Sequence, residues 1–507
     1  MSDQSPATFL RLNEKDNVVI ALENFEAGDI IDELDLTLKS DVPFGHKIAT
    51  ETIARGEPVR RYGQVVALAT EDIAIGVHVH ENIKAQDQGS SEDMIGLDAR
   101  ETQFVESPAT FMGYKRADGK VGTRNYIGII TTVNCSATAA RAIADHYRGS
   151  AMDAYPNVDG VVALTHTSGC GMNPSGEGMK MLRRTLAGYA RNPNFASIIV
   201  LGLGCEQNSI AGFLEAEDLV ESGDLVVATI QDTGGTRKTL DWGIEQVDAM
   251  LARANQCKRE PVSASHLILG TQCGGSDALS GVSANSAVGY AVDLLVANGG
   301  TAILSETVEL HGADHLLLRR CASKEVGQKL MTQLDWWRER MMKSIGQVIN
   351  VTPGNFAGGL STAPEKSLGS FAKGGSTNLV ASYDYAMPVT EKGFVYMDTP
   401  AFDPSSVTGQ IAGGANIVCF TTGRGSAFGS VPSPCLKLSS NNELFRRQSD
   451  DIDLNAGTIL SGEETVQECG ERFFQLILDT ASGKITSSEE FGYGQNEFAP
   501  WIPDMTL

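Results

Sequence analysis

Four apolar segments of the sequence each end in a turn that carries a cysteine, and this repeated arrangement most restricts the possible folds. The four thiols are Cys135, Cys170, Cys205 and Cys273. Around Cys273 the pattern is clearest, since a strand-like run at 266–270 precedes a glycine-rich turn, a helix-like run at 286–296 and a second strand. This alternation of strand, turn and helix predicts an α/β fold.

The ends of these strands are also where a ligand is expected. In open α/β sheets ligands bind outside the carboxyl ends of the strands, and helix N-termini there favour anions and thiolates. We therefore expect that the four cysteines can converge on one site. Each of them taken alone fits equally well as a small buried apolar residue.

The size and charge of the chain exclude some classes of protein. A chain of 507 residues is long enough for about three domains. Its net charge of -23 argues against non-specific binding of nucleic acid or anionic membranes, which depends on clustered cations. No apolar run approaches the length of about 18 residues typical of a membrane helix, and no signal-like segment is present, so we expect a cytoplasmic protein.

Cysteine usage points to reduced thiols. The nine cysteines are an odd number spread through a long chain, which argues against a disulfide framework. No pair has the CxxC spacing of a structural zinc site. Motifs of other enzyme classes are also missing, because the sequence has no P-loop, no GxGxxG after a strand and no GxSxG elbow.

The first part of the chain, residues 8–84, has short strand-like runs between glycine turns and is predicted to form a small all-β domain of hairpins. His78 and His80 alternate along one run and should point to the same face, and His46 follows a turn at Pro43. Two histidines on one face can bind a metal or a substrate hydroxyl. The alternative is a solvated strand face.

The rest of the chain is divided by composition. We predict a flexible acidic linker at 85–110, an α/β domain at 111–262 and a C-terminal α/β domain at 263–507.

A hairpin at 111–125 carries four cations that face either an anionic substrate or solvent. The glycine-rich segment 350–373 is predicted to be a loop close to a ligand or to backbone. The turn 421–425, TTGRG, fits either a carboxylate site or an ordinary tight turn.

Short blocks along nearly the whole chain resemble the altronate dehydratase / galactarate dehydratase family of sugar-acid dehydratases. The blocks GHKIA, RYG and GVHVH resemble its SAF (β-clip) domain, and VGTRN, HTSGCG, GLGCE, QCGGSD, TTGRG and NAGTI follow in order. The resemblance implies a small all-β SAF domain followed by Rossmann-like α/β domains. It also implies loss of water from an aldonate or aldarate, with a divalent metal, usually iron(II), as cofactor.

The resemblance also suggests a substrate. The motif at His78 and His80 resembles altronate dehydratases, so we expect D-altronate to be converted to 2-dehydro-3-deoxy-D-gluconate, with galactarate or another sugar acid as the alternative. The expected partner is thus a small-molecule sugar acid, without nucleic acid or membrane. The sequence does not fix the oligomeric state, for which a homodimer is the working expectation.

This reaction requires a base at C2, an acid at the C3 hydroxyl and positive charge on the carboxylate. We expect Fe(2+), or alternatively Mn(2+) or Mg(2+), to act as a Lewis acid. The residues expected to bind the metal are His46, His78, His80, Cys135, Cys170, Cys205 and Glu206. The candidate catalytic residues are His166, Glu306, Cys273 and Asp277, with His166 and Glu306 as the candidate bases. The candidate substrate-binding residues are Arg124, Gly274, Gly275, Ser276, Thr422 and Arg424.

Three other hypotheses remain. Three cysteines can hold an iron–sulfur cluster with one open iron, but their spacing matches no standard cluster motif, so a mononuclear metal is preferred. A non-catalytic sugar-acid sensor would need the carboxylate site but neither metal nor base. An oxidoreductase on this scaffold would need a nucleotide, for which the fingerprint is missing.

Overall fold

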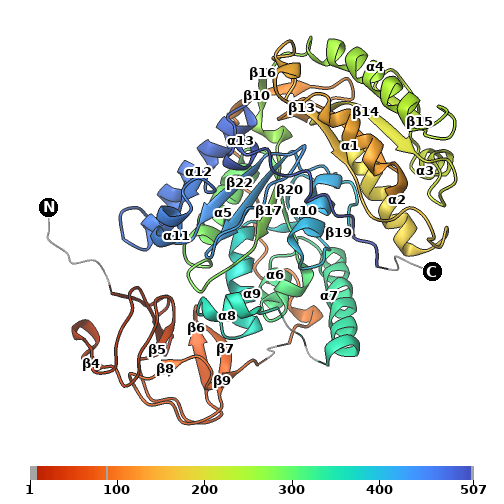
Figure 1. Ribbon diagram of the computed structural model, residues 1–507. Coiled ribbons are helices and arrows are strands. Elements are labelled where there is room, and N and C mark those ends of the chain that lie inside the picture. Colours follow the sequence, from red (N-terminus) through yellow and green to blue (C-terminus); the bar gives the residue numbers. More distant parts are fainter. Residues whose placement is uncertain (1–7, 87–88, 347, 349, 504–507) are drawn as a thin grey trace.

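The computed structural model describes residues 8–86, 89–346, 348 and 350–503. Figure 1 shows a small β domain at one end, an α/β domain at the other, and a larger α/β domain between them. The prediction of an all-β N-terminal domain followed by α/β domains with parallel sheets is confirmed. Among the described residues, no helix is both long and apolar enough to cross a membrane.

The N-terminal β domain consists of short antiparallel strands. One sheet has the order β1-β2-β5-β8, a second β6-β7-β9, and β3 pairs with β4. Glycines with positive φ, among them Gly28, Gly56 and Gly76, form its tight turns. The strands are β1 (Phe9–Leu10), β2 (Val18–Ala21), β3 (Ile30–Ile31), β4 (Leu36–Thr37), β5 (Lys47–Ala49), β6 (Pro58–Arg61), β7 (Gln64–Ala69), β8 (His78–Val79) and β9 (Ile83–Lys84).

The segment after this domain is not a free tether in its described part. It contains a short 3-10 helix, and the amides of Gly96 and Asp98 donate to carbonyls of Leu318 and Arg319 in the C-terminal domain. The Asp98 carboxylate also pairs with the Arg319 guanidinium. Residues of this segment thus contact the C-terminal domain.

The second domain is a four-stranded parallel sheet with the order β13-β12-β14-β15, covered by α1 and α4 on one face and by α2 on the other. The hairpin predicted at 111–125 is present, and its strand β10 also pairs with β16. The elements are β10 (Thr110–Lys115), β11 (Val121–Gly122), β12 (Tyr126–Thr131), α1 (Ala137–Asp145), β13 (Gly160–Leu164), α2 (Glu177–Ala190), β14 (Phe195–Gly202), α3 (Ile210–Ala216), β15 (Leu225–Thr229), α4 (Thr236–Ala254) and β16 (Glu260–Ser263).

The C-terminal domain is built on a seven-stranded parallel sheet with the order β19-β20-β18-β17-β21-β22-β23. Its central strands are buried along their whole length, as expected for a sheet covered by helices on both faces. The strands are β17 (Ile268–Cys273), β18 (Thr301–Leu304), β19 (Leu379–Tyr383), β20 (Gly393–Met397), β21 (Ile417–Thr422), β22 (Cys435–Ser439) and β23 (Leu454–Asn455).

Helices complete this domain and connect it to the other two. Helices α5 and α12 pack together on one face of the sheet, while α10 contacts α2 of the second domain. The helices are α5 (Ala284–Ala297), α6 (Asp314–Arg319), α7 (Lys324–Ile345), α8 (Pro353–Ala357), α9 (Ala363–Phe371), α10 (Asp403–Ala412), α11 (Asn442–Arg447), α12 (Val466–Ala481) and α13 (Ser487–Glu490).

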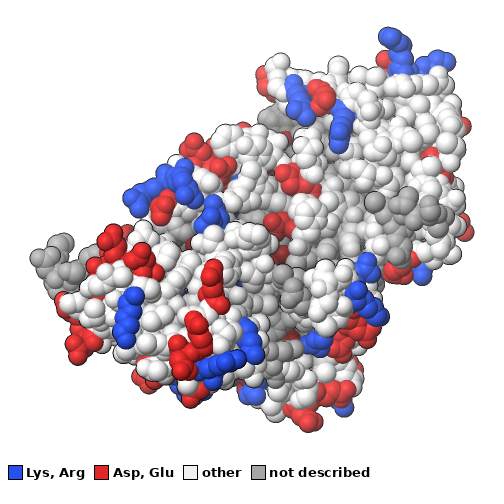
Figure 2. Space-filling view, turned by 60° about the horizontal axis from the view of Figure 1, so that its bottom comes forward, with Lys and Arg blue, Asp and Glu red and all other residues white. Residues whose placement is uncertain are grey.

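The surface carries both kinds of charge. On the face shown in Figure 2, acidic and basic side chains of the described residues are interspersed, and they form no extended basic patch on that face. The full chain carries a net charge of -23.

Candidate functional site

The strand order of the C-terminal sheet reverses between β17 and β21, and we call the carboxyl ends of these two strands the crevice, since ligands bind at such a place in α/β sheets. The chain runs outward from β17 through β18 to β20 and later returns to β21 on the other side of β17. Such a reversal of strand order opens a ligand crevice in α/β sheets. The turn after β17 and the turn after β21 flank it, and the amides of Gly423 and Arg424 donate to Gly275 O at 3.1 and 2.9 Å.

A buried group of polar side chains lies beside this crevice, and we call it the acid–lysine cluster. Its members come from the ends of β17 and β18 and from the segment 363–374. They are Cys273, Glu306, Glu309, Lys366, Ser370 and Lys373. Ligand atoms of Cys273, Glu306 and Glu309 all lie within 4.8 Å of one another.

Two lysines hold the cluster together. Lys373 Nζ lies 2.7 Å from Cys273 Sγ, 3.0 Å from Ser370 Oγ and 3.7 Å from Glu306 Oε2. Lys366 Nζ lies 2.6 Å from Glu309 Oε1. Because buried charges are tolerated only when they are paired, the lysines and the carboxylates depend on one another.

The two carboxylates of the cluster differ in proton affinity. Burial raises the pKa of Glu306 well above its usual range, and the nearby Glu309 raises it further. Burial acts in the same direction on Glu309, but Lys366 and Lys373 more than offset it, so the pKa of Glu309 is lowered. Within the described structure, Glu306 Oε2 is buried without a hydrogen-bond partner. Glu306 is therefore suited to exchanging a proton with a ligand in the crevice.

Two neighbours of Glu306 are also perturbed. Burial raises the pKa of Cys273 to about 12, although the nearby Lys373 acts to lower it. Burial raises the pKa of Asp403 to about 6, and Gln272 Nε2 donates to its Oδ1 at 2.8 Å. A Cβ on Gly274 would lie 2.5 Å from Asp403 Oδ2, so the turn needs glycine at this position.

Asp277, a candidate catalytic residue, forms structural hydrogen bonds instead. Burial raises its pKa, but its carboxylate accepts hydrogen bonds from Ser280, Ser440 and Asn441. The amides of Leu279 and Ser280 donate to it as well. These bonds fix the turn after β17, so Asp277 organises the crevice.

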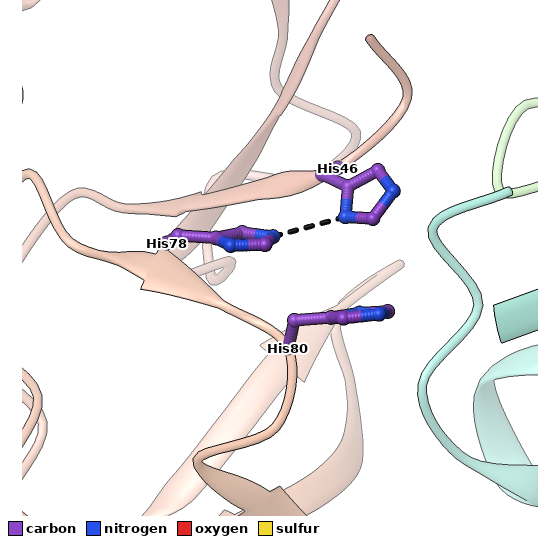
Figure 3. Close-up of side chains that lie close together, drawn as sticks. All are labelled: His46, His78 and His80. Carbon is purple, nitrogen blue, oxygen red and sulfur yellow. Dashed lines mark hydrogen bonds between the residues drawn. The ribbon is translucent and has the colours of Figure 1, made fainter. Parts of the chain in front are cut away.

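Three histidines of the N-terminal domain form a second cluster, drawn in Figure 3. His46 precedes β5, His78 lies in the neighbouring strand β8, and His80 follows it. The rings of His78 and His80 are stacked with centroids 5.3 Å apart, and His46 Nδ1 lies 2.9 Å from His78 Nε2. Nitrogen atoms of all three lie within 4.8 Å of one another. The predicted common face for His78 and His80 is therefore present.

The environment keeps these imidazoles neutral. Burial lowers the pKa of all three histidines, to about 4 for His78 and about 3 for His80, with a further contribution from Lys47. His80 Nδ1 lies 2.7 Å from Ser361 Oγ, which orients the ring. Three neutral imidazoles with converging nitrogens are a suitable donor set for a divalent metal.

A buried ionic contact ties the histidine domain to the C-terminal domain. Glu365 of α9 pairs with Lys47 at 2.9 Å and with Arg61 at 2.7 Å. The next residue of α9 is Lys366, which belongs to the acid–lysine cluster. One helix therefore contacts both the N-terminal domain and the acid–lysine cluster, which couples docking of that domain to the geometry of the crevice.

The space enclosed beneath the N-terminal domain is small. A cavity of about 10 Å³, lined by Tyr62, Cys273, Asp277, Glu365, Lys366 and Ser370, lies where the two domains meet. Ligand sites for small molecules usually measure about 300 Å³ or more. The docked arrangement therefore leaves no room for a substrate between Tyr62 and Cys273.

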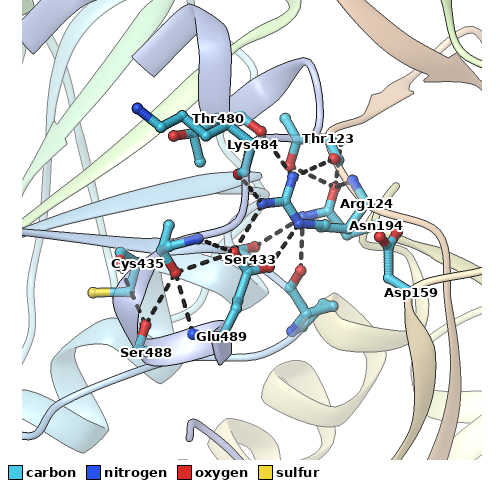
Figure 4. A network of polar contacts seen from close by, with 12 residues as sticks. Thr123, Arg124, Asp159, Asn194, Ser433, Cys435, Thr480, Lys484, Ser488 and Glu489 are labelled. Atoms are coloured by element: carbon cyan, nitrogen blue, oxygen red, sulfur yellow. Dashed lines mark hydrogen bonds and ion pairs between the residues drawn. The ribbon is translucent and has the colours of Figure 1, made fainter. Parts of the chain in front are cut away.

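Arg124, expected to bind a substrate, is engaged elsewhere. Figure 4 shows its guanidinium among residues of the second and C-terminal domains. It binds both oxygens of Glu489 at 2.6 and 2.8 Å and donates to carbonyls of Thr123, Thr480 and Lys484. These contacts occupy its donors and join the two domains.

A substitution tests this structural role of Arg124. Arg124→Lys keeps the charge but loses the two-pronged contact with Glu489, so the free energy of unfolding should fall by about 1–3 kcal/mol. Thermal unfolding measures this loss, and KM for the substrate should remain that of the wild type. A raised KM with unchanged stability would instead favour the substrate-binding role.

The other candidates are divided among several places. Of the residues expected to hold the substrate carboxylate, Arg424 has an exposed side chain, whereas Thr422 Oγ1 accepts from the amide of Gly425. Gly274 N donates to Thr421 O, and Ser276 O accepts from Asn355. Arg424 is thus exposed at the rim of the crevice, whereas the Thr422 hydroxyl and the backbone groups of Gly274 and Ser276 form hydrogen bonds within the protein.

The four cysteines do not meet at one site. Cys273 belongs to the C-terminal sheet, whereas Cys135, Cys170 and Cys205 follow three strands of the second domain. His166 and Glu206 lie on the second domain as well. His166 contacts Thr131 O and Ser168 Oγ, each at 2.9 Å. The metal ligands expected as one set therefore lie on two domains at opposite ends of the molecule (Figure 1).

Sequence reasoning missed the lysines of the acid–lysine cluster. The segment 350–373 was predicted to be a loop, but it forms α8 and α9, and the prediction is wrong because glycine content outweighed the capping signals. Thr352 and Thr362 cap these helices, and a proline stands in the first turn of each. Those signals would have placed Lys366 and Ser370 on one helix.

Comparison with known proteins covers all three domains. Residues 7–86 match the altronate/galactarate dehydratase SAF domain, residues 113–255 the second domain of D-galactarate dehydratase/altronate hydrolase, and residues 264–506 the C-terminal domain of D-galactarate/altronate dehydratase.

Three curated relatives align over nearly their full length. Galactarate dehydratase (L-threo-forming) of Escherichia coli is 36% identical, with 98% of this chain and 97% of that protein covered. Altronate dehydratase of Escherichia coli is 33% identical over 95% and 96% of the two chains. Altronate dehydratase of Bacillus subtilis is 31% identical over 95% and 97%.

Proposed function

Since the chain belongs to the D-galactarate/altronate dehydratase family and is thus a hydro-lyase, we propose that it converts D-altronate to 2-dehydro-3-deoxy-D-gluconate. The observation that carries the assignment of the site is the acid–lysine cluster. It places a carboxyl group of raised pKa, Glu306, beside a buried ammonium group at the ligand crevice. Dehydration next to a carboxylate needs a base and positive charge close together, and this pair supplies both.

Each residue of the cluster has a role in the proposal. Glu306 removes the C2 proton, because a carboxylate with a raised pKa is a stronger base when it ionises. Burial lowers the pKa of Lys373, but Cys273 and the two glutamates reverse this effect, so Lys373 stays protonated and stabilises the enediolate. Asp403, with a pKa of about 6, delivers a proton to the leaving C3 hydroxyl.

We place the divalent metal on His46, His78 and His80. The positive charges of Lys366 and Lys373 disfavour a metal ion in the acid–lysine cluster. The three imidazoles, in contrast, are neutral and their nitrogens converge. Iron(II) fits this nitrogen set, with manganese(II) and magnesium(II) as alternatives. When bound, the metal supplies Lewis acidity toward oxygen atoms of a ligand.

The N-terminal domain acts as a lid in this proposal. The cavity of about 10 Å³ between the domains cannot admit a sugar acid, so the lid, which carries Tyr62, must move away from Cys273 and α9 before binding. Closure then excludes water from the crevice. The Lys47 and Arg61 pairs with Glu365 hold the closed form.

The choice of altronate rests on charge at the crevice. Arg424 is exposed at its rim, while Lys47, Arg61, Lys366 and Lys373 are buried against acidic partners or the Cys273 thiol. Among the residues that the structure describes at the crevice, Arg424 is the exposed cation and matches one carboxylate, as in an aldonate, whereas an aldarate would need a second. Identities of 36%, 33% and 31% do not separate the two substrate classes.

Turnover of metal-stripped protein tests the proposal. The protein is supplied anaerobically with iron(II), manganese(II) or magnesium(II), and 2-keto acid formation is followed on altronate, galactarate and other sugar acids. Metal-dependent product from altronate alone supports the proposal. Product from galactarate alone replaces the substrate, and no product with any metal overturns the catalytic role in favour of a sugar-acid sensor.

Two substitutions test the metal site. His78→Ala removes one ligand, so the protein should no longer retain a stoichiometric metal after gel filtration. Ser361→Ala removes the group that orients His80, and affinity for the metal should fall about 10–100-fold. Metal titration measures both, with the exposed His146 on α1's C-terminal side as a matched control through His146→Ala. Unchanged metal content in His78→Ala would contradict the assignment.

A further inference from the structure

The second domain has a ligand crevice of its own. Its chain runs from β12 to β13 on one side and returns to β14 on the other side of β12. The reversal of strand order therefore lies between β12 and β14, where α/β sheets bind ligands. Cys135 follows β12, Cys205 follows β14, and Cys170 follows β13. Three thiols are thus placed at one edge of one sheet.

Direct hydrogen bonds hold the three cysteine-bearing turns together. Asn134 N donates to Ser168 O at 3.0 Å, which joins the turn of Cys135 to that of Cys170. Asn208 N donates to Gly169 O at 3.0 Å and Asn208 Nδ2 to Thr132 O at 3.1 Å. A Cβ on Gly169 would lie 2.1 Å from Thr132 O, so glycine is required for this close approach.

Two other potential metal ligands at this edge of the sheet, Glu206 and His166, bind to groups within the protein. Glu206 accepts from Thr132 Oγ1 at 2.7 Å and from the amide of Gly204 at 2.7 Å, so its carboxylate fixes the turn of Cys205. His166 uses both ring nitrogens on Thr131 and Ser168. Glu206 and His166 are therefore engaged within the protein, whereas the three thiols are exposed.

The exposure of these thiols is unusual within the chain. Cys135, Cys170 and Cys205 are exposed, Cys257 is partly exposed, and Cys273, Cys321, Cys419, Cys435 and Cys469 are buried. A cysteine that serves as a small apolar residue is normally buried. Beside Cys205 a cavity of about 650 Å³, lined by Gly204, Glu206, Ser209 and Trp242 among others, opens at the same sheet edge.

The three thiols are too far apart in this structure to share a single ion. A single tetrahedral ion with metal–sulfur bonds of about 2.3 Å requires sulfur atoms about 3.8 Å apart. Among the described residues, the clusters whose ligand atoms all lie within 4.8 Å are those of His46 and of Cys273, and the three exposed thiols are not among them. Thiolates of an iron–sulfur cluster bind different iron atoms and so lie farther apart.

We propose that Cys135, Cys170 and Cys205 bind an iron–sulfur cluster, whose fourth iron is open to a small oxygen ligand from the adjoining cavity. This centre is distinct from the histidine site and from the acid–lysine cluster. It replaces the sequence-based preference for a mononuclear metal on these cysteines. The lack of a standard cluster motif follows from the fold, because each ligand comes from a different strand end.

Anaerobic reconstitution of the full-length protein with iron(II) and sulfide tests the proposal. A broad absorbance band near about 400 nm, with about four irons and four sulfides per chain, is the expected result. Cys135→Ser, Cys170→Ser and Cys205→Ser should each abolish the band, whereas Cys257→Ser should retain it. Circular dichroism checks folding, and the exposed positions of the three thiols make misfolding of these variants an unexpected outcome.

Other outcomes would overturn the proposal. They are one equivalent of metal bound without sulfide, a disulfide between two of the three cysteines in the anaerobic protein, or a band that persists in the triple serine variant. The spectroscopic readout does not depend on turnover, so failure here leaves the dehydratase assignment untouched. If the reconstituted wild-type protein shows the absorbance band but no turnover of altronate, the cluster proposal stands and the proposed altronate reaction fails.

Discussion

Glu306→Gln should lower turnover by about 10²–10⁴-fold, the usual contribution of a positioned general base. The substitution keeps the shape of the side chain and removes the group that accepts the C2 proton. Exchange of the C2 proton with deuterated solvent should disappear with turnover, since both need the same step. Metal content should stay unchanged, because the proposed ligands lie in the N-terminal domain.

The same substitution should stabilise the fold. The raised pKa of Glu306 means that, above the unfolded value of 4.5, the folded protein holds a proton that the unfolded chain has released. This group therefore makes the wild type progressively less stable as pH rises from about 4.5, and glutamine removes that loss. Urea unfolding of both proteins from pH 4 to 8 measures the difference, which should widen with pH.

A matched control separates this effect from general damage. Glu443→Gln changes an exposed glutamate of α11 that pairs with Arg447, and both turnover and stability should remain those of the wild type. If Glu306→Gln keeps half of the wild-type rate, Glu306 is not the base. If turnover falls while C2 exchange continues, Glu306 acts after proton removal.

The architecture was predictable because local patterns determine it. Apolar runs ending in small residues marked β12, β14 and β17, and their carboxyl ends do carry the candidate groups. His78 and His80 share a face because strand geometry alternates side chains. These features depend on neighbouring residues along the chain, and a single sequence contains them.

The composition of the site was less predictable because it depends on long-range contacts. Cys273 meets Lys373, a hundred residues away, only after α9 packs on the sheet. Arg124 looked like a free cation, but folding brings it to Glu489. No local pattern shows which partner neutralises a charge, so the sequence does not distinguish a buried ion pair from a substrate-binding residue.

Glu365→Ala should open the lid. The side chain is fully buried between Lys47 and Arg61, and its removal leaves two buried cations without a carboxylate partner. Breaking such a contact costs about 3–5 kcal/mol, which corresponds to a shift of about 100-fold or more toward the undocked form. Turnover should fall accordingly, while the two α/β domains remain folded. Hydrogen exchange of β5, β6 and β7 should rise because these strands face the lost contact.

The pH dependence of docking follows from the same contact. Burial alone raises the pKa of Glu365, but Lys47 and Arg61 reverse this effect and lower it to about 2. A lowered pKa means that the contact stabilises the closed form above the unfolded value of 4.5 and that this stabilisation is lost as pH falls toward about 2. In Glu365→Ala, hydrogen exchange of β5, β6 and β7 should therefore lack the acid-induced rise that protonation of Glu365 causes in the wild type.

The exposed pair of Glu339 and Lys343 on α7 provides the control, because Glu339→Ala removes a solvent-screened contact that contributes little. Its exchange pattern and turnover should match those of the wild type. A Glu365→Ala protein with wild-type exchange in β5 to β7 would mean that other contacts hold the lid. Raised exchange with full turnover would mean that closure of the N-terminal domain is not needed for the reaction, and the histidine site would then lose its proposed place in catalysis.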